Sequence, residues 1–183
     1  MGYAVEMFLR DEESPAIRQL FSTTRSVLAD IGTTPHVSLA VFEDVDVPKL
    51  IQIVRGFAAR IASFRLRFSS VGTFPGRENV VFLAPVVTGV LLRVHTSLHE
   101  QLAVQGLSCH PHYLPGLWVP HCAVTVDEPI GSSLNTIKAI HDANVLGEYT
   151  IDNVNVVEFR PVVTLASFGL RNRDAEPSVP GDA

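Results

Sequence analysis

Two histidines stand at corresponding places in two similar stretches of the chain. Residues 34–41 read TPHVSLAV and residues 119–126 read VPHCAVTV, so His36 and His121 lie 85 residues apart, each directly after a proline. Apolar side chains alternate after each histidine, which predicts a β-strand that begins there. Two imidazoles that face each other can supply one proton acceptor and one proton donor, and cleavage of a phosphodiester needs both.

Side chains on a strand alternate between its two faces. This alternation places Ser38 on the face of His36, and it places Ala123 and Thr125 on the face of His121. Taken alone, either histidine is better explained as a strand-end residue that hydrogen-bonds locally. Recurrence in register, each time after proline and on the polar face, favours a shared function instead.

The repeat continues beyond the two motifs. Residues 50–61 carry apolar side chains at the three-and-four spacing of a helix, and residues 134–145 carry a weaker version of the same stripe. An alternating strand follows each helix. Strand, helix and strand therefore recur over approximately 34–74 and 119–159, which predicts a duplicated lobe with a pseudo-two-fold axis and a site between the lobes.

The remaining pattern predicts an α+β protein. A helix is expected from Ser14-Pro15, with Ser14 as N-cap, to Gly32. No glycine-rich linker separates the halves, so residues 1–170 are predicted to form one domain. The polar tail, 171–183, is predicted to be disordered. Further elements are expected as strands at 3–9, 79–84 and 162–170 and as a helix from Thr88 or Gly89 to about Gln105.

Composition narrows the class of partner. The chain has 183 residues, 46% of them hydrophobic, and a net charge of −5. The negative charge argues against binding to long nucleic acid but leaves room for a small nucleotide or an RNA end. The longest apolar stretch is too short to span a bilayer. Two cysteines are too few for a disulfide framework, so we expect a reduced, cytoplasmic protein, and a monomer.

Several other residues have types that could bind ligands. His95 and His99 are four apart on a predicted helix, but the stretch lacks the HExxH pattern. They flank the apolar stripe of that helix and are expected at the boundary between its buried and polar faces. Cys109, His110 and His112 are residue types that bind zinc, but the sequence offers no second pair of such residues to match them, so no metal site is predicted. Tyr113 either stacks a base or packs its loop. Glu6 interrupts an apolar strand and faces either the cleft or solvent.

The two motifs resemble the signature of the 2H phosphoesterases, which include the 2′-5′ RNA ligase-like proteins and cyclic nucleotide phosphodiesterases. These proteins carry His-x-(Thr or Ser)-x twice on a duplicated α+β scaffold. The resemblance covers roughly residues 2–170, including the run YLPGLWVPHCAVTV. It implies two lobes, each an antiparallel sheet backed by helices, with the histidines in a central cleft.

The resemblance also implies roles. His36 and His121 would be the catalytic pair, one activating water or a ribose hydroxyl and the other protonating the leaving oxygen. Ser38 would donate a hydrogen bond to a phosphate oxygen. The implied reaction is hydrolysis of a 2′,3′-cyclic phosphate, or the making and breaking of 2′-5′ linkages, without a metal or cofactor.

Ala123 departs from the family pattern, because it stands where the second motif has a hydroxyl residue. A hydrogen bond to a charged group is worth about 1.5–3 kcal/mol, so its loss predicts a weakened site rather than an inactive one. Thr125, further along the same predicted face, is a candidate for the missing contact. Two alternatives stay open: a module that binds a nucleotide without turnover, and an enzyme for a cyclic phosphodiester of another metabolite.

Overall fold

The computed structural model describes residues 2–24, 27–30, 32–74, 79–127, 131–159 and 161–172. Strands and helices follow one another along the chain much as the sequence pattern predicts. In chain order they are β1 (Gly2–Leu9), η1 (Asp11–Glu13), α1 (Pro15–Thr23), α2 (Val27–Asp30), β2 (His36–Phe42), α3 (Val47–Ala58), β3 (Phe64–Phe74), β4 (Val80–Pro85), α4 (Gly89–Val104), η2 (Pro111–Tyr113), β5 (Cys122–Thr125), α5 (Ser133–Ala143), β6 (Glu148–Phe159) and β7 (Val163–Gly169).

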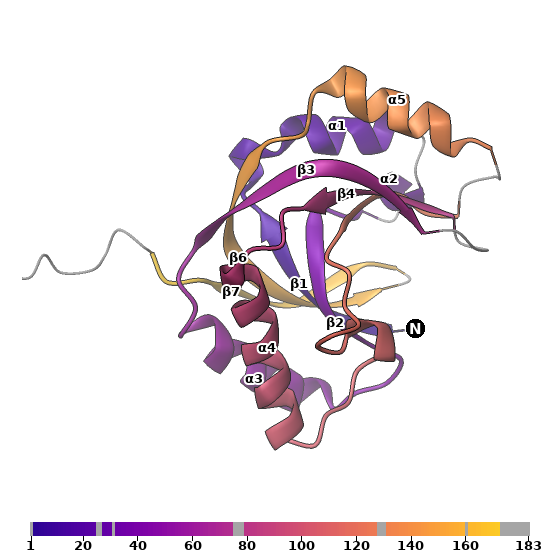
Figure 1. Ribbon diagram of the computed structural model, residues 1–183. Helices are drawn as coiled ribbons and strands as arrows, with labels where there is room; N and C mark the ends of the chain where they lie inside the picture. The colour runs from indigo at the N-terminus through magenta and orange to yellow at the C-terminus, as the bar shows by residue number, and fades with distance from the viewer. Residues whose placement is uncertain are drawn as a thin grey trace, which may run out of the picture.

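The strands form one connected antiparallel sheet in the order β2-β1-β6-β3-β4-β5, with β7 paired to β6. Lobe one consists of β1, β2, β6 and β7, and lobe two of β3, β4 and β5. The predicted α+β class with two antiparallel lobes is confirmed. The strands of the two lobes form one continuous sheet because β3 of lobe two pairs with β6 of lobe one (Figure 1).

The join between the lobes is itself symmetric. Phe64 pairs with Ile151 and Leu66 pairs with Tyr149. Tyr149 lies 85 residues after Phe64, and Ile151 lies 85 residues after Leu66. The 85-residue repeat therefore converts each of the two pairs into the other. Arg65 and Thr150, which are 85 residues apart, face each other at the centre, and the Arg65 guanidinium donates to Thr150 Oγ1 at 2.8 Å. The observed register therefore agrees with the repeat found in the sequence.

The helices cover the outer faces of the lobes. In Figure 1, α1 and α5 lie together against lobe two, while α3 and α4 lie together against lobe one. Asp46 accepts a hydrogen bond from Lys49 N at the start of α3, and Thr88 accepts one from Leu91 N at the start of α4. These side-chain caps satisfy backbone groups that the helix itself leaves unpaired.

The predicted helix between Ser14 and Gly32 is divided into α1 and α2, so the prediction of one continuous helix is wrong. α1 ends at Thr23, and the Thr24 hydroxyl bonds the carbonyls of Leu20 and Phe21. Threonine hydroxyls that bond the preceding turn compete with helix continuation. Ser14 occupies the N-cap position but donates its hydroxyl to Arg10 O instead of accepting from the helix.

The end of the described chain is attached to the segment that joins α3 to β3. Arg171 N donates to Ile61 O, and Ser63 N donates to Arg171 O. Most of the tail predicted to be disordered, from residue 173 onward, lies outside the described residues.

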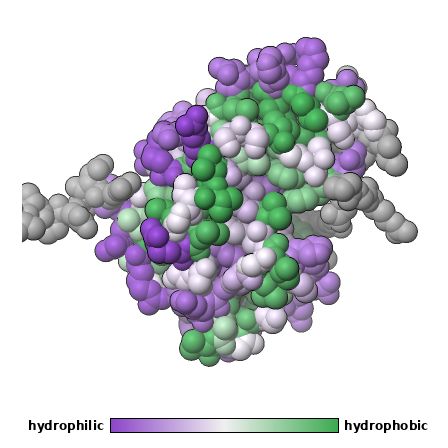
Figure 2. All heavy atoms as spheres, viewed as in Figure 1, coloured by the Kyte–Doolittle hydropathy of each residue, from purple (hydrophilic) through white to green (hydrophobic). Residues whose placement is uncertain are grey.

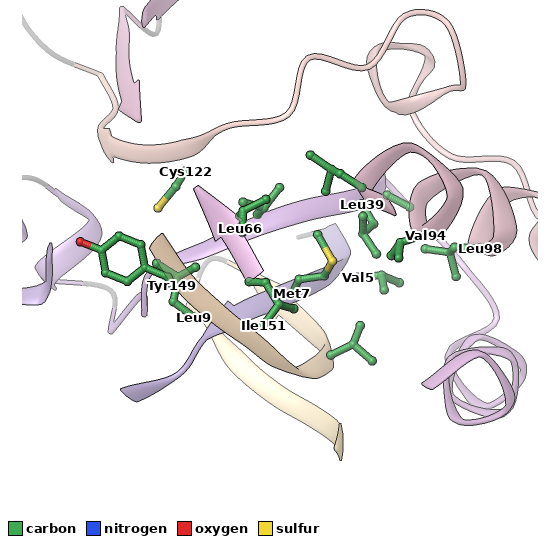
Figure 3. Close-up of a cluster of buried hydrophobic side chains, with 14 of the residues drawn as sticks. Val5, Met7, Leu9, Leu39, Leu66, Val94, Leu98, Cys122, Tyr149 and Ile151 are labelled. Carbon is green, nitrogen blue, oxygen red and sulfur yellow. The ribbon is translucent and has the colours of Figure 1, made fainter. Parts of the chain in front are cut away.

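The core extends from one lobe into the other. Figure 3 shows Val94 and Leu98 of α4 pointing toward Leu39 and Val5, while Cys122 of lobe two lies near Tyr149 of β6. On the surface, Figure 2 shows hydrophobic residues beside the start of α4, where four aliphatic side chains are exposed. They are Val86, Val87, Val90 and Leu92. Among the helices of the described residues, none combines the length and apolar character needed to cross a membrane.

Gly72 of β3 is required by close packing. It pairs with Phe82 of β4, and a Cβ built on Gly72 would lie 2.4 Å from the Phe82 ring. The ring cannot move aside easily, because Phe74 lies 4.4 Å and His121 5.3 Å from its centroid.

Replacing Gly72 by alanine should lower the free energy of unfolding by about 1–3 kcal/mol, because the new methyl group overpacks the aromatic cluster. Gly56 is the matched control. It lies inside α3 with no atom within 4 Å of its built Cβ, so Gly56→Ala should instead raise stability by about 0.5–1 kcal/mol. Urea unfolding of both variants gives these differences, and a Gly72→Ala midpoint equal to wild type would contradict the packing argument.

Candidate active site

Both motif histidines are anchored in the same way. Nδ1 of His36 lies 2.7 Å from Thr34 O, and Nδ1 of His121 lies 2.8 Å from Val119 O. A carbonyl oxygen only accepts, so Nδ1 must carry the hydrogen, and in the neutral ring Nε2 is left as the basic atom. A proline stands between each histidine and the residue whose carbonyl it bonds. This proline keeps that residue extended, so that its carbonyl points toward the imidazole. This explains why the two motifs share Pro-His.

The structure brings the two histidines together. β2 and β5, which come from different lobes, contact each other. The pKa of His121 is lowered from its ordinary value, mainly by burial and further by the positive charge of His36, while the bond to Val119 acts in the opposite direction. The two imidazoles are therefore close enough for one to influence the protonation of the other.

His36 has an acidic partner. Its Nε2 lies 3.3 Å from Oε1 of Glu6, and its ring packs 5.9 Å from that of Phe8. Burial raises the pKa of Glu6, whose residue is only 8% exposed, and the charge of His36 partly offsets that rise. Glu6 thus faces His36 and not solvent, which decides between the two directions that the sequence left open.

A row of polar side chains crosses lobe one beside His36. Ser38 pairs directly with Glu6, and Glu6 pairs with Asn155 of β6. Directly opposed residues of antiparallel strands share a face, so the three side chains lie side by side. Asn155 is 4% exposed, and its Oδ1 has no hydrogen-bond partner within the described part of the chain.

The corresponding row of lobe two is apolar. Ala123 pairs with Phe82, and Phe82 pairs with Gly72. The His121 ring lies 4.9 Å from Phe74, edge to face, and 5.3 Å from Phe82. The two histidines therefore have matching anchors but opposite surroundings, one acidic and one aromatic.

Thr125 does not share the face of His121, and the prediction that it does is wrong. Ala123 pairs with Phe82 but Thr125 pairs with the next residue, Val81, so Val124 forms a β-bulge. The bulge turns Thr125 to the core side, where it is 0% exposed and its hydroxyl lacks a partner among the described residues. A bulge stands at the equivalent place in β2, where Ala40 is also fully buried.

The outer edge of β2 is covered by side chains from α4 and the loop after it. His99 Nε2 donates to Leu39 O at 3.1 Å, and Trp118 Nε1 donates to Ser38 O at 3.1 Å. His95 stacks on Trp118 with ring centroids 4.0 Å apart and donates to Tyr113 O. His95 and His99 are buried, so the prediction that they lie at the boundary between the buried and polar faces of the helix is wrong.

The remaining candidates lie in the loop before β5. Tyr113 is half-buried and packs against the core. Cys109 is buried, and the rings of His110 and His112 contact each other at 4.8 Å. Within the described ranges, no group of three or more histidine, cysteine, aspartate or glutamate side chains is placed to hold a metal ion.

The family model for the 2′-5′ RNA ligase superfamily matches residues 8–162. The chain belongs to this superfamily. The match includes both histidine motifs and most of both lobes, and it places the protein among the 2H phosphoesterases. No protein with curated properties matches the chain.

Solved structures share the fold. TT0787 of Thermus thermophilus is 21% identical, with a TM-score of 0.61 over 94% of this chain and 100% of that one. E. coli LigT in its apo form is 18% identical, with a TM-score of 0.60 over 93% and 98% of the two chains. Kluyveromyces marxianus Usb1 is more distant, at 11% identity and a TM-score of 0.50 over 90% and 97%.

Three residues around the histidines escaped the sequence motifs. Glu6 had a signal, because it is the only charged residue in the strand GYAVEMFL. Phe74 and Phe82 had none, because phenylalanines that line a site look like core residues in a sequence. Their role depends on strand pairing, which a single sequence does not reveal.

Acid should destabilise the fold through the α4 histidines. The pKa of His95 is lowered to about 4, mainly by burial and further by the charge of His99, and burial also lowers the pKa of His99. The unfolded chain therefore binds more protons than the folded one below about pH 6.5. The free energy of unfolding should fall between about pH 6.5 and pH 4, with His95 contributing up to about 3 kcal/mol.

Urea unfolding at several pH values measures this fall. His95→Gln keeps a side-chain donor but does not titrate, so its stability should decrease less steeply than that of wild type. His141 on α5 has a side chain 89% exposed, and His141→Gln should follow the wild-type slope. Equal slopes for all three proteins would refute the assignment to His95.

Proposed function

We propose that the protein is a metal-independent phosphoesterase that hydrolyses, or reversibly ligates, a 2′,3′-cyclic phosphate or 2′-5′ phosphodiester of a nucleotide or RNA end. One observation carries the proposal. The two motif histidines, at the starts of contacting strands of two lobes, are both anchored through Nδ1, so neither Nε2 is taken up by a backbone carbonyl.

The reaction needs a proton acceptor for the attacking oxygen and a proton donor for the leaving oxygen. His36 and His121 supply both, so no metal is required to activate water. Ser38 lies on the face of His36, next to Glu6 in the strand register. Its hydroxyl would donate a hydrogen bond to a phosphate oxygen, as the first family motif implies.

A small, phosphate-bearing substrate fits the charge of the chain. The net charge is −5, which disfavours contact with a long nucleic acid backbone. E. coli LigT, which shares this fold, has been solved with 3′-AMP, ATP, NADP+ and phosphate. These ligands support a nucleotide or a nucleotide-like RNA end as the substrate of this protein.

Replacing either motif histidine should abolish most turnover. His36→Ala and His121→Ala should each lower kcat/KM for 2′,3′-cyclic nucleotides by about 10²–10⁴-fold, the usual contribution of a general acid or base. Hydrolysis in EDTA is the assay, and wild-type activity should not depend on the chelator. His141→Ala, on the outer helix α5, serves as the control with unchanged activity. Loss of wild-type activity in EDTA, or full activity in both motif variants, would exclude the mechanism.

A second candidate function is nucleotide binding without efficient turnover. Its support is the apolar row of Ala123, Phe82 and Gly72, where lobe one has polar side chains. A site that holds phosphate from one lobe only could bind a nucleotide and leave its transition state poorly stabilised.

Restoring a hydroxyl at position 123 separates the two functions. If the protein is a weakened enzyme, Ala123→Thr should raise kcat/KM by about 10–100-fold, the value of one hydrogen bond to a charged group. Ala123→Ser tests the same contact with less crowding of Phe82, and Ser38→Ala should cause a loss of similar size. Wild-type turnover close to that of both hydroxyl variants would show that the contact is dispensable, whereas binding without turnover in all of them would favour the binding module.

A further inference from the structure

Glu6 and His36 lie close enough to share one proton. Nδ1 of His36 gives its hydrogen to Thr34 O, so in the neutral ring Nε2 is a bare lone pair that lies 3.3 Å from Oε1 of Glu6. A lone pair of nitrogen and one of a carboxylate repel at that distance, and little solvent reaches these side chains to screen them. A proton on Nε2 or on the carboxyl group removes the repulsion.

We propose that this shared proton is the one given to the leaving oxygen, so that Glu6 is a positioning residue for His36 as general acid and His121 is the general base. The acid and base roles rest on the proposed function. The placement of the proton on the Glu6 side of the site rests on the geometry alone.

The surroundings of His121 favour the opposite protonation state. Phe74 and Phe82 flank its ring, and its neighbour on the strand face is Ala123. The charged group that acts on it is His36, whose positive charge disfavours a second one nearby. A neutral His121 with its hydrogen on Nδ1 presents a free electron pair at Nε2, as a general base requires.

The other groups around Glu6 do not compete with His36. Ser38 and Asn155, its neighbours in the strand register, are neutral. The Cys122 thiol of β5 is also near, and burial raises its pKa to about 12, so it is uncharged at neutral pH. Within the described ranges, His36 is the one ion-pair partner of Glu6.

The hydrolytic step then balances. The oxygen of water forms a bond to phosphorus while the bond from phosphorus to one ribose oxygen breaks. The proton of water passes to Nε2 of His121, and the proton shared by Glu6 and His36 passes to the leaving ribose oxygen. Exchange with solvent removes the proton from His121 and restores the one at His36.

Glu6→Gln tests this arrangement because it removes the charge and keeps the shape. In the pH–rate profile of kcat/KM for 2′,3′-cyclic nucleotides, the alkaline limb should move about one unit toward lower pH, since the imidazolium of His36 loses its counter-charge. Glu43, exposed just after β2, is the matched control, and Glu43→Gln should leave the profile unchanged. An alkaline limb that does not move in Glu6→Gln overturns the proposal.

A substrate with a good leaving group tests the roles of the two histidines directly. The leaving group of bis(p-nitrophenyl) phosphate departs without a proton, so loss of the general acid should matter little. His36→Ala should therefore lose much less activity on this diester than on the cyclic nucleotide, whereas His121→Ala should lose similar factors on both. The reverse pattern would assign the acid to His121 and refute the proposal.

Proton placement can also be measured without turnover. NMR titration of the histidine rings, assigned through single variants, follows the protonation of His36 and of His121 separately. Glu6→Gln should lower the His36 midpoint by about one pH unit. If wild type hydrolyses no cyclic phosphate, the proposed function fails, while this titration still decides whether Glu6 holds the proton on His36. An unchanged midpoint overturns the inference even in an active enzyme.

Discussion

The pairing of β3 with β6 is the constraint on which the site depends. It is the place where the two lobes share backbone hydrogen bonds, and the Glu13 carboxylate strengthens it by accepting from Thr150 N at 2.6 Å and from Thr150 Oγ1 at 2.8 Å. Arg65, opposite Thr150, reaches the same carboxylate. Because strand pairing fixes the register of one lobe against the other, the relation of β2 to β5 follows from the sheet and not from a linker. The distance between His36 and His121 is set in this way.

The backbone of the protein is more symmetric than its side chains. Both histidines follow a proline at the start of a strand, both bond a carbonyl two residues earlier, and both strands carry a bulge at the same place. The side chains that pair with Ser38 and Ala123 differ in kind, because Ser38 pairs with the acidic Glu6 and Ala123 pairs with the aromatic Phe82. A symmetric backbone thus holds two identical imidazoles in different electrostatic surroundings. This is what acid–base catalysis needs, because a donor and an acceptor must differ in protonation at the same pH.

Periodicity predicted most of the strands and helices, because each of their buried faces repeats along the sequence. It failed where one inserted residue changed the phase. The sequence alternation assigned Thr125 to the face of His121, but the bulge at Val124 reversed the remaining side chains of β5. The division of the first long helix was missed for a related reason, since hydroxyls that bond the preceding turn leave no apolar signal. Strand pairing, which selected Glu6 and Phe82 as neighbours of the histidines, has no signature in one sequence.

The sequence separation between a histidine and the carbonyl that it bonds explains which histidines could be recognised as site residues from the sequence. His36 and His121 are held by carbonyls two residues away, so the Pro-His motif contains the whole anchor. His95 and His99 are held through Nε2 by carbonyls 18 and 60 residues away, and nothing near them in the sequence specifies those partners. A local anchor through Nδ1 leaves the far nitrogen available for chemistry, whereas a distant anchor through Nε2 uses it to join two elements. The four histidines therefore divide into two that face the site and two that join α4 to other segments, His99 to β2 and His95 to the loop before β5.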